Sequence, residues 1–241
     1  MEFEKLSAPS LKDLFVRQLQ RSILSGELPA GTPLPPEREL AQQMQVSRAV
    51  INGGLGELAN QGFLEIRPRQ GAFVADYRTK GNLSTLAAIM EFQGGVMGRE
   101  EIRAILEVRL ALEKLVVERA IRCASDEALE KLGEQLKRLT DAQTSAQAAD
   151  AVFAFAHDLA LISGNSIVPL IYYSFKPAVT TLWIRFCQLY GIEALVYNTK
   201  TVYNYLCARD PDAAMDWIDR YLTEAISGSQ QIYWENGTER I

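Results

Sequence analysis

The chain has 241 residues, of which 48% are hydrophobic and 23% are charged, and its formal net charge is −5. This composition excludes a disordered chain, and no apolar run approaches the ~18–20 residues of a membrane helix. The acidic start is unlike a signal peptide, so we expect a cytoplasmic protein with no membrane partner. Residues 1–77 hold 8 basic and 9 acidic side chains, so a nucleic-acid surface must be a local basic cluster.

The first 77 residues change from short helical patterns to a pair of strand patterns. Apolar residues recur at helical spacing in three segments broken by Gly and Pro, and two alternating runs follow them. Ser47 is a suitable N-cap for the third helix. The predicted elements are helices over 11–24, 37–44 and 47–62, and strands over 63–66 and 72–74.

This order of elements is typical of a winged helix-turn-helix. Two helices joined by a tight turn set the second at an angle that fits the major groove of DNA. The loop between the two strands, residues 67–71, then forms a wing that reaches the backbone or the minor groove. We therefore predict that residues 1–77 form a DNA-binding domain.

The rest of the chain reads as long helices after a polar linker at residues 78–85. Pro177 is expected to kink or split its helix. Asp210 followed by Pro211 is an N-cap with proline at the first helical position. We predict a mainly α fold in which residues 86–241 form an antiparallel bundle of six to seven helices. The predicted helices are 99–123, one opened by 125–127, 146–163, 168–190, 192–207 and 211 to about 234.

One segment carries a family signature. Residues 29–41 read PAGTPLPPERELA, and the pattern continues through Val46-Ser47-Arg48, residues 61–64 and residues 71–74. This sequence resembles the GntR family of bacterial regulators over about residues 8–76. The signature is much more specific than a generic helix-turn-helix pattern.

The second part resembles the branch of that family with an all-helical effector domain, the FadR or FCD branch. The landmarks, which are weak singly and convincing in their order, are Val108-Arg109, Glu113, Ser163-Gly164-Asn165 and residues 210–214. The resemblance implies a homodimer that binds a short palindromic DNA operator. It also implies a small-molecule effector in the helical domain that changes operator affinity, often in the control of carboxylate, sugar or fatty-acid metabolism.

The resemblance carries over to a set of residues that contact DNA. Arg48, at the start of the recognition helix, can pair with guanine, which is worth roughly 1–3 kcal/mol of discrimination. Ser47 can cap this helix and touch a phosphate. The DNA-binding residues expected from the family pattern are Arg38, Ser47, Arg48, Asn52, Arg67, Arg69 and the backbone at Gly71.

The recognition helix departs from the family pattern in one place. Asn52 replaces the usual second arginine, and Gly53 and Gly54 follow it. Asparagine can still read adenine, but each glycine inside a helix costs up to ~1 kcal/mol relative to alanine. The departure predicts an altered operator preference, or a recognition helix that becomes ordered only when it binds DNA. It also leaves open a second function: a helical ligand-binding or interaction module with a decayed reader, which means that its N-terminal domain no longer binds DNA.

Many members of this branch bind a divalent metal, but this chain lacks the ligands. The family pattern places Val152, Ala156, Thr199 and Tyr221 at the four ligand positions, and none has a carboxylate or an imidazole. The one histidine, His157, is one residue out of register, and we interpret it as structural. We therefore predict no metal and no cofactor.

Without a metal, the effector needs another anchor. Aromatic residues gather after residue 170 and can line an apolar pocket with polar tips. Arg109 is the expected partner of an anion. A branch member that responds to fatty acyl-CoA also lacks the metal ligands, and Asp219-Arg220-Tyr221 is similar to its final-helix pattern, so the resemblance implies an acyl compound or a carboxylate as the effector. The ligand-binding residues that we expect are Arg109, Phe155, Thr199 and Tyr221.

Two classes of function therefore remain, and an enzyme is not one of them. One histidine, with no GxSxG elbow and no Gly-rich phosphate loop, gives no support to catalysis. A ligand-responsive regulator should bind DNA with an affinity that falls steeply with salt. A module with a decayed reader should not bind DNA even at low salt.

Overall fold

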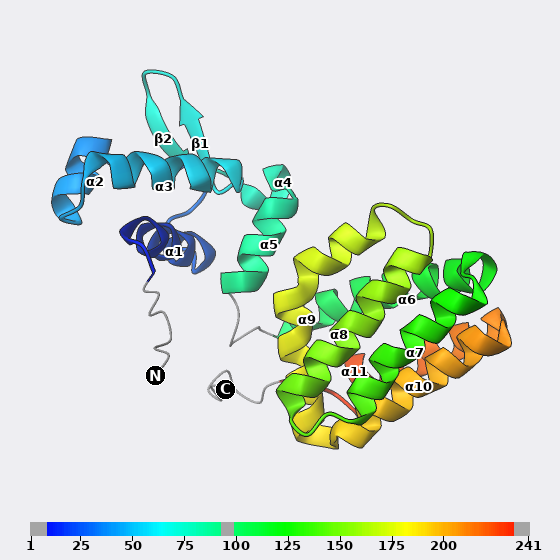
Figure 1. Cartoon of the computed structure of the whole chain (residues 1–241). Helices are drawn as coiled ribbons and strands as arrows, with labels where there is room; N and C mark the ends of the chain where they lie inside the picture. The colour runs from blue at the N-terminus through cyan, green and yellow to red at the C-terminus, as the bar shows by residue number, and fades with distance from the viewer. Residues whose placement is uncertain (1–8, 93–98, 234–241) are drawn as a thin grey trace, which may run out of the picture. The chain divides into compact units, whose positions relative to one another are not determined.

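The computed structural model describes residues 9–92 and 99–233, which fall into two compact units on either side of residue 92 (Figure 1). The first unit contains five helices and one two-stranded sheet. Its elements are α1 (Leu11–Leu24), α2 (Glu37–Gln43), α3 (Arg48–Asn60), β1 (Leu64–Arg67), β2 (Gly71–Val74), α4 (Tyr77–Lys80) and α5 (Leu83–Phe92).

Local signals in the sequence set the ends of the first helices. Ser10 and Asp13 form a capping box at the start of α1. The Ser47 hydroxyl accepts a hydrogen bond from the Val50 amide, 3.3 Å away, and caps α3. Gln45, with a φ of 54°, makes the tight turn between α2 and α3. The predicted helix-turn-helix is therefore present, and each boundary lies close to its expected position.

The two strands form an antiparallel hairpin, with Leu64 opposite Val74 and Arg67 opposite Gly71. The segment before α2 joins its outer edge, because the Leu34 amide donates to the Ala72 carbonyl at 2.8 Å. The hairpin is thus tied to the helices and projects as the predicted wing (Figure 1).

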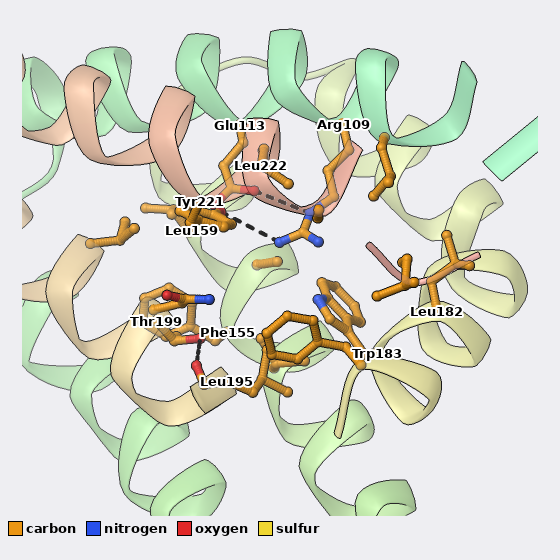
Figure 2. Close-up of a pocket in the computed structure, with 18 of the residues that line it drawn as sticks. Arg109, Glu113, Phe155, Leu159, Leu182, Trp183, Leu195, Thr199, Tyr221 and Leu222 are labelled. Atoms are coloured by element: carbon orange, nitrogen blue, oxygen red, sulfur yellow. Dashed lines mark hydrogen bonds and ion pairs between the residues drawn. The ribbon is translucent and has the colours of Figure 1, made fainter. Parts of the chain in front are cut away.

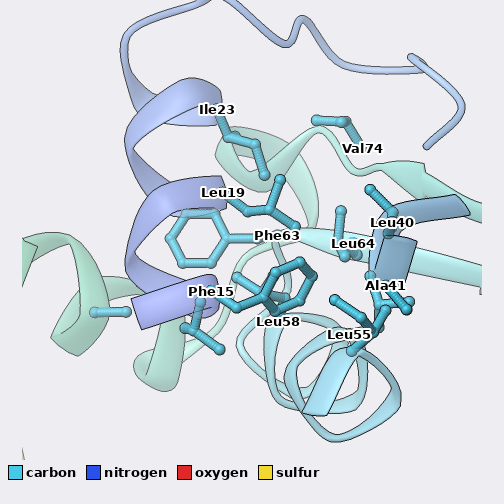
Figure 3. Packing of buried hydrophobic residues seen from close by; sticks show 13 residues of the cluster. Phe15, Leu19, Ile23, Leu40, Ala41, Leu55, Leu58, Phe63, Leu64 and Val74 are labelled. Atoms are coloured by element: carbon cyan, nitrogen blue, oxygen red, sulfur yellow. The ribbon is translucent and has the colours of Figure 1, made fainter. Parts of the chain in front are cut away.

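A compact apolar core holds this unit together, as Figure 3 shows. Burying a side chain of the size of leucine or phenylalanine stabilises a fold by about 1.5–3 kcal/mol. Each element of the helix-turn-helix and the wing contributes at least one such residue. The core includes Phe15, Leu19, Ile23, Leu40, Leu55, Leu58, Phe63, Leu64 and Val74.

Gly54 has a packing role in this core. A Cβ atom at Gly54 would overlap the ring of Phe15, which is only 3% exposed. Gly53 faces outward, and a Cβ there would meet only Lys12 Cδ, at 3.6 Å. The close approach of α1 to α3 therefore requires a glycine at one of the two positions and tolerates a side chain at the other.

Residues 78–85, expected to be a linker, lie partly in helices. They include most of α4, a turn and the start of α5. The turn is attached to the end of α3, since Asn82 Nδ2 donates to the Asn60 carbonyl at 3.2 Å and the Thr85 hydroxyl donates to the Gln61 carbonyl. The first compact unit accordingly extends to residue 92.

The second unit contains six helices in the residues that the structure describes (Figure 1). Helix α8 packs against α7 and α9, and α6 packs against α11. Asp210 caps α11, where its side chain accepts from the Ala213 amide at 3.0 Å. The helices are α6 (Arg99–Cys123), α7 (Asp126–Thr140), α8 (Ser145–Ile162), α9 (Val168–Tyr190), α10 (Ile192–Ala208) and α11 (Pro211–Ile226).

The mainly α fold class is confirmed. Of the two effects expected of Pro177, a kink or a split, the split does not occur, because α9 continues from Val168 to Tyr190. Helix α11 ends at Ile226, earlier than residue 234, because the chain turns at Gly228, whose amide donates to the Thr223 and Glu224 carbonyls at 3.1 Å. Within the described ranges, no helix has the length and apolar character needed to span a membrane.

Candidate functional site

The helix-turn-helix formed by α2 and α3 presents four of the predicted DNA-binding residues to solvent. Arg38, Ser47, Arg48 and Asn52 are all exposed. Asn52 Nδ2 donates to Glu37 Oε1 at 3.2 Å, which links the recognition helix to the first turn of α2. All four side chains are therefore accessible to DNA, and Asn52 has an acidic neighbour.

The wing holds the other predicted residues, and its two arginines differ. Arg67 pairs with Glu65 at 3.1 Å and its guanidinium lies 4.3 Å from the centroid of the Phe73 ring. Arg69 is exposed at the tip with a φ of 62°, and Gly71 follows with a φ of 105°. The wing therefore offers one arginine held by its own hairpin and one that points into solvent.

The second unit contains a largely apolar cavity enclosed by α6, α8, α9, α10 and α11 (Figure 2). Its atom-free space, mouth included, is about 710 Å³, which is an upper bound on the volume of a ligand. Ligand pockets in proteins have this character, with apolar walls and a few placed polar groups. The four predicted ligand-binding residues, Arg109, Phe155, Thr199 and Tyr221, all line it.

The polar part of the cavity is a network of three side chains. Arg109 Nε lies 3.2 Å from Glu113 Oε2, one turn further along α6. Arg109 Nη2 donates to the Tyr221 hydroxyl at 3.4 Å, and that hydroxyl donates to Glu113 Oε1. The network therefore connects α6 to α11 and fixes the guanidinium at the wall of the cavity, as the dashed lines in Figure 2 show.

The same network controls the charges in the cavity. Burial opposes the charge of Arg109, but Glu113 and the neighbouring tyrosines outweigh it, so the pKa of Arg109 is raised and the guanidinium stays charged. Burial, with Glu113 as second cause, raises the pKa of Tyr172 and Tyr221 above the usual range. Both tyrosines are therefore neutral hydrogen-bond donors at physiological pH.

The four positions that would hold a metal in many relatives also line this cavity. They are occupied by Val152, Ala156, Thr199 and Tyr221. The Thr199 hydroxyl donates to the Leu195 carbonyl of its own helix at 2.9 Å. In the part of the chain that the structure describes, no cluster of three or more His, Cys, Asp or Glu side chains could hold a metal ion. The residues present do not fit a divalent metal.

His157 lies among aromatic side chains rather than at the cavity. Its ring centroid is 5.8 Å from that of Phe153, in a stacked arrangement, and 6.1 Å from that of Tyr173. This environment agrees with a structural role.

Sequence reasoning missed the role of Glu113, which was recognised only as a family landmark but is the direct partner of Arg109. Trp183 and Tyr172 belong to the aromatic group after residue 170 that was expected to line a pocket, and both do line the cavity. The Arg109 guanidinium lies 4.9 Å from the centroid of the Trp183 ring. The spacing of Arg109 and Glu113, four residues apart on a helix, is the one signal that could have indicated the pair.

Comparison with known families matches both parts of the chain. Residues 13–74 match the family described as bacterial regulatory proteins of the gntR family. Residues 104–224, half of the chain, match the FCD domain.

Individual relatives agree with these matches. The chain is 28% identical to the HTH-type transcriptional regulator Mce2R of Mycobacterium tuberculosis over 215 residues, 89% of each chain. It is 31% identical to a fatty acid metabolism regulator protein of Shewanella halifaxensis over 161 residues, 66% of this chain and 65% of that one.

A solved structure shares the fold. It is that of Lar, described as controlling expression of the Listeria monocytogenes agr system, with a TM-score of 0.62 and 18% identity. The match covers 93% of this chain and 98% of that one. A winged helix-turn-helix, a helical effector-type domain and these relatives lead to one conclusion: the chain belongs to the GntR family of transcription regulators, in its FCD branch, and is not an enzyme.

Proposed function

We propose that this regulator binds a palindromic DNA operator as a homodimer and that an acyl or carboxylate effector in the helical unit changes its operator affinity. In this proposal residues 1–77 read DNA, and residues 86–241 hold the effector and the dimer contacts. Two-fold symmetry of the operator would mirror the symmetry of the dimer.

The observation that carries the effector proposal is the position of Arg109. Its guanidinium is the cationic group in the lining of a largely apolar cavity, and Trp183 and Tyr221 flank it. A guanidinium in this setting matches a carboxylate or another anionic oxygen group. The apolar walls, including Leu159, Phe155 and Leu182, match a hydrocarbon body.

The relatives favour the acyl class among possible carboxylates. Several Shewanella proteins that resemble this chain are named fatty acid metabolism regulators. Those names describe the relatives, and they direct the choice of probes: octanoate, decanoate, dodecanoate and their alcohol analogues.

The alternative of a decayed DNA reader depends on α3. Two glycines could have left this helix unformed, but it is continuous from Arg48 to Asn60. Gly54 packs against Phe15, so the close packing of α1 and α3 explains the presence of this glycine without any loss of function. These observations support an intact reader with an altered base preference at Asn52.

Selection from random duplex DNA by the full-length protein tests the proposal, followed by a salt titration on the enriched sequence. We expect a short palindrome and a steep loss of affinity with salt, because phosphate contacts release counterions. The titration is then repeated with decanoate and with decan-1-ol, and only decanoate should change operator affinity strongly. No enrichment in either the presence or the absence of decanoate would favour the decayed reader.

A further inference from the structure

The indole N–H of Trp183 is a buried donor with no acceptor. Trp183 is 4% exposed, and in the described part of the protein its Nε1 atom has no hydrogen-bond partner. A buried polar group without a partner costs free energy, so such atoms in folded proteins call for an explanation.

The location of this nitrogen suggests that explanation. Trp183 lines the main cavity and a second, smaller apolar cavity that shares Arg109, Ala156 and Tyr172 with it. In Figure 2 the indole nitrogen lies on the side of the Trp183 ring nearer to Arg109, whose guanidinium lies over that ring, 4.9 Å from its centroid. A cation and an N–H donor without an acceptor therefore lie close together at the wall of the cavity.

The hydrogen bonds of Arg109 leave room for such an acceptor. Its Nε and Nη2 atoms are committed to Glu113 and Tyr221. The Nη1 atom of Arg109 remains available for a ligand. The same guanidinium lies 4.9 Å from the Trp183 ring centroid.

We propose that Trp183 Nε1 and Arg109 Nη1 together bind one oxygen-bearing head group, so that Trp183 is a specificity-determining residue of the effector site. A ligand oxygen that lies within hydrogen-bond distance of both nitrogens gives each an acceptor. A carboxylate supplies two such oxygens, and an alcohol supplies one weaker acceptor. An alkylamine supplies a cation, which the Arg109 guanidinium would repel. The inference rests on the proposed effector function.

The chain contains its own control for this assignment. Trp217 has a half-buried indole, and its Nε1 already donates to the Asn198 carbonyl at 3.3 Å. Trp217 does not line the cavity and should not respond directly to a head group.

The test uses ¹⁵N-labelled full-length protein and decanoate as the probe. The Trp183→Phe variant identifies the Trp183 indole signal in ¹H–¹⁵N correlation spectra by its disappearance. We expect decanoate to move this indole proton downfield and to slow its exchange with water, because a new hydrogen bond forms. The Trp217 signal should stay nearly fixed.

Calorimetry on the variants supplies the second readout. Trp183→Phe keeps an apolar ring and removes the N–H, so decanoate should bind about tenfold more weakly than to the parent. The affinity for decan-1-ol should fall by a smaller factor. Trp217→Phe should bind decanoate as the parent does.

Three outcomes are distinguishable. Decanoate that binds and shifts the Trp183 signal supports the inference. If decanoate binds but the Trp183 signal does not move, the proposed role of Trp183 is wrong, and the carboxylate effector is not contradicted. Equal affinity of the parent and Trp183→Phe for decanoate would have the same meaning. Failure of octanoate, decanoate and dodecanoate to bind at all contradicts both this inference and the proposed carboxylate effector.

Discussion

Phe15 of α1 lies so close to Gly54 of α3 that no side chain fits between them. Gly54→Ala should therefore destabilise the protein by about 1–3 kcal/mol, because the buried ring and the helix would have to move apart. Urea denaturation measures the change.

Gly53→Ala is the matched control. It meets only Lys12 Cδ at 3.6 Å, and it should stabilise by about 0.5–1 kcal/mol through helix propensity. Equal effects of the two variants would show that backbone freedom, and not the contact with Phe15, explains the glycine pair.

Arg48→Ala should relax specificity at one base pair of each operator half-site. Arg48 is exposed at the start of α3, and a bidentate contact with guanine is worth about 1–3 kcal/mol. Binding to a set of single-base operator variants measures the loss. Arg69→Ala, at the wing tip, should instead weaken all variants alike and lower the salt slope by about one. A uniform loss with Arg48→Ala would remove that residue from base recognition.

Glu113→Gln should separate folding stability from ligand affinity. It leaves the largely buried Arg109 without its carboxylate partner, so the ligand-free protein should lose about 1–3 kcal/mol. An anionic ligand no longer competes with Glu113 for the guanidinium, so decanoate should bind more tightly. Thermal denaturation with and without decanoate, together with calorimetry, tests both halves. Weaker binding in this variant would mean that Glu113 orients Arg109 for the ligand.

Alkaline pH should destabilise the helical unit through Tyr172. Its pKa is raised in the folded protein by burial and by Glu113, so the unfolded chain loses this proton first. The stabilisation is fully present below about pH 10 and falls by about 1.4 kcal/mol per pH unit above it. Urea denaturation between about pH 9 and 11 should show a shallower decline for Tyr172→Phe. Parallel declines would contradict the raised pKa.

Chelators should leave the melting temperature unchanged, since the family ligand positions carry Val152, Ala156, Thr199 and Tyr221. Differential scanning fluorimetry with and without EDTA measures this. A drop in the melting temperature that zinc reverses would show that other residues hold a metal.

Local patterns in the sequence predicted most of the helices. The boundaries of α1, α6 and α9 agree with the apolar periodicity, and the cap residues Ser47 and Asp210 act as expected. These signals are local, so one sequence contains them in full. The residues between 77 and 92 were harder, because their helices depend on contacts such as that of Thr85 with the end of α3.

The residues of the candidate site likewise fall into those that the sequence predicted and those that only the structure revealed. The family pattern and the inward position of Arg109 indicated four residues that do line one cavity. The partner of Arg109 and the unpaired nitrogen of Trp183 depend on how α6, α9 and α11 pack together. No periodicity encodes whether an indole N–H has an acceptor, so only the three-dimensional arrangement reveals it.

The bond between Glu113 and Tyr221 joins residues that are 108 positions apart, and Lys114 and Asp219 bridge the same two helices at 2.6 Å. A ribosome therefore completes every element of the winged helix-turn-helix long before it adds the helix that finishes the cavity. Because domains fold as units during synthesis, a chain interrupted before α11 would carry the DNA-reading fold without the polar network of the effector site. Premature stops or proteolysis near residue 210 would then yield a fragment that keeps the fold of the winged helix-turn-helix but lacks the Glu113–Tyr221 bond.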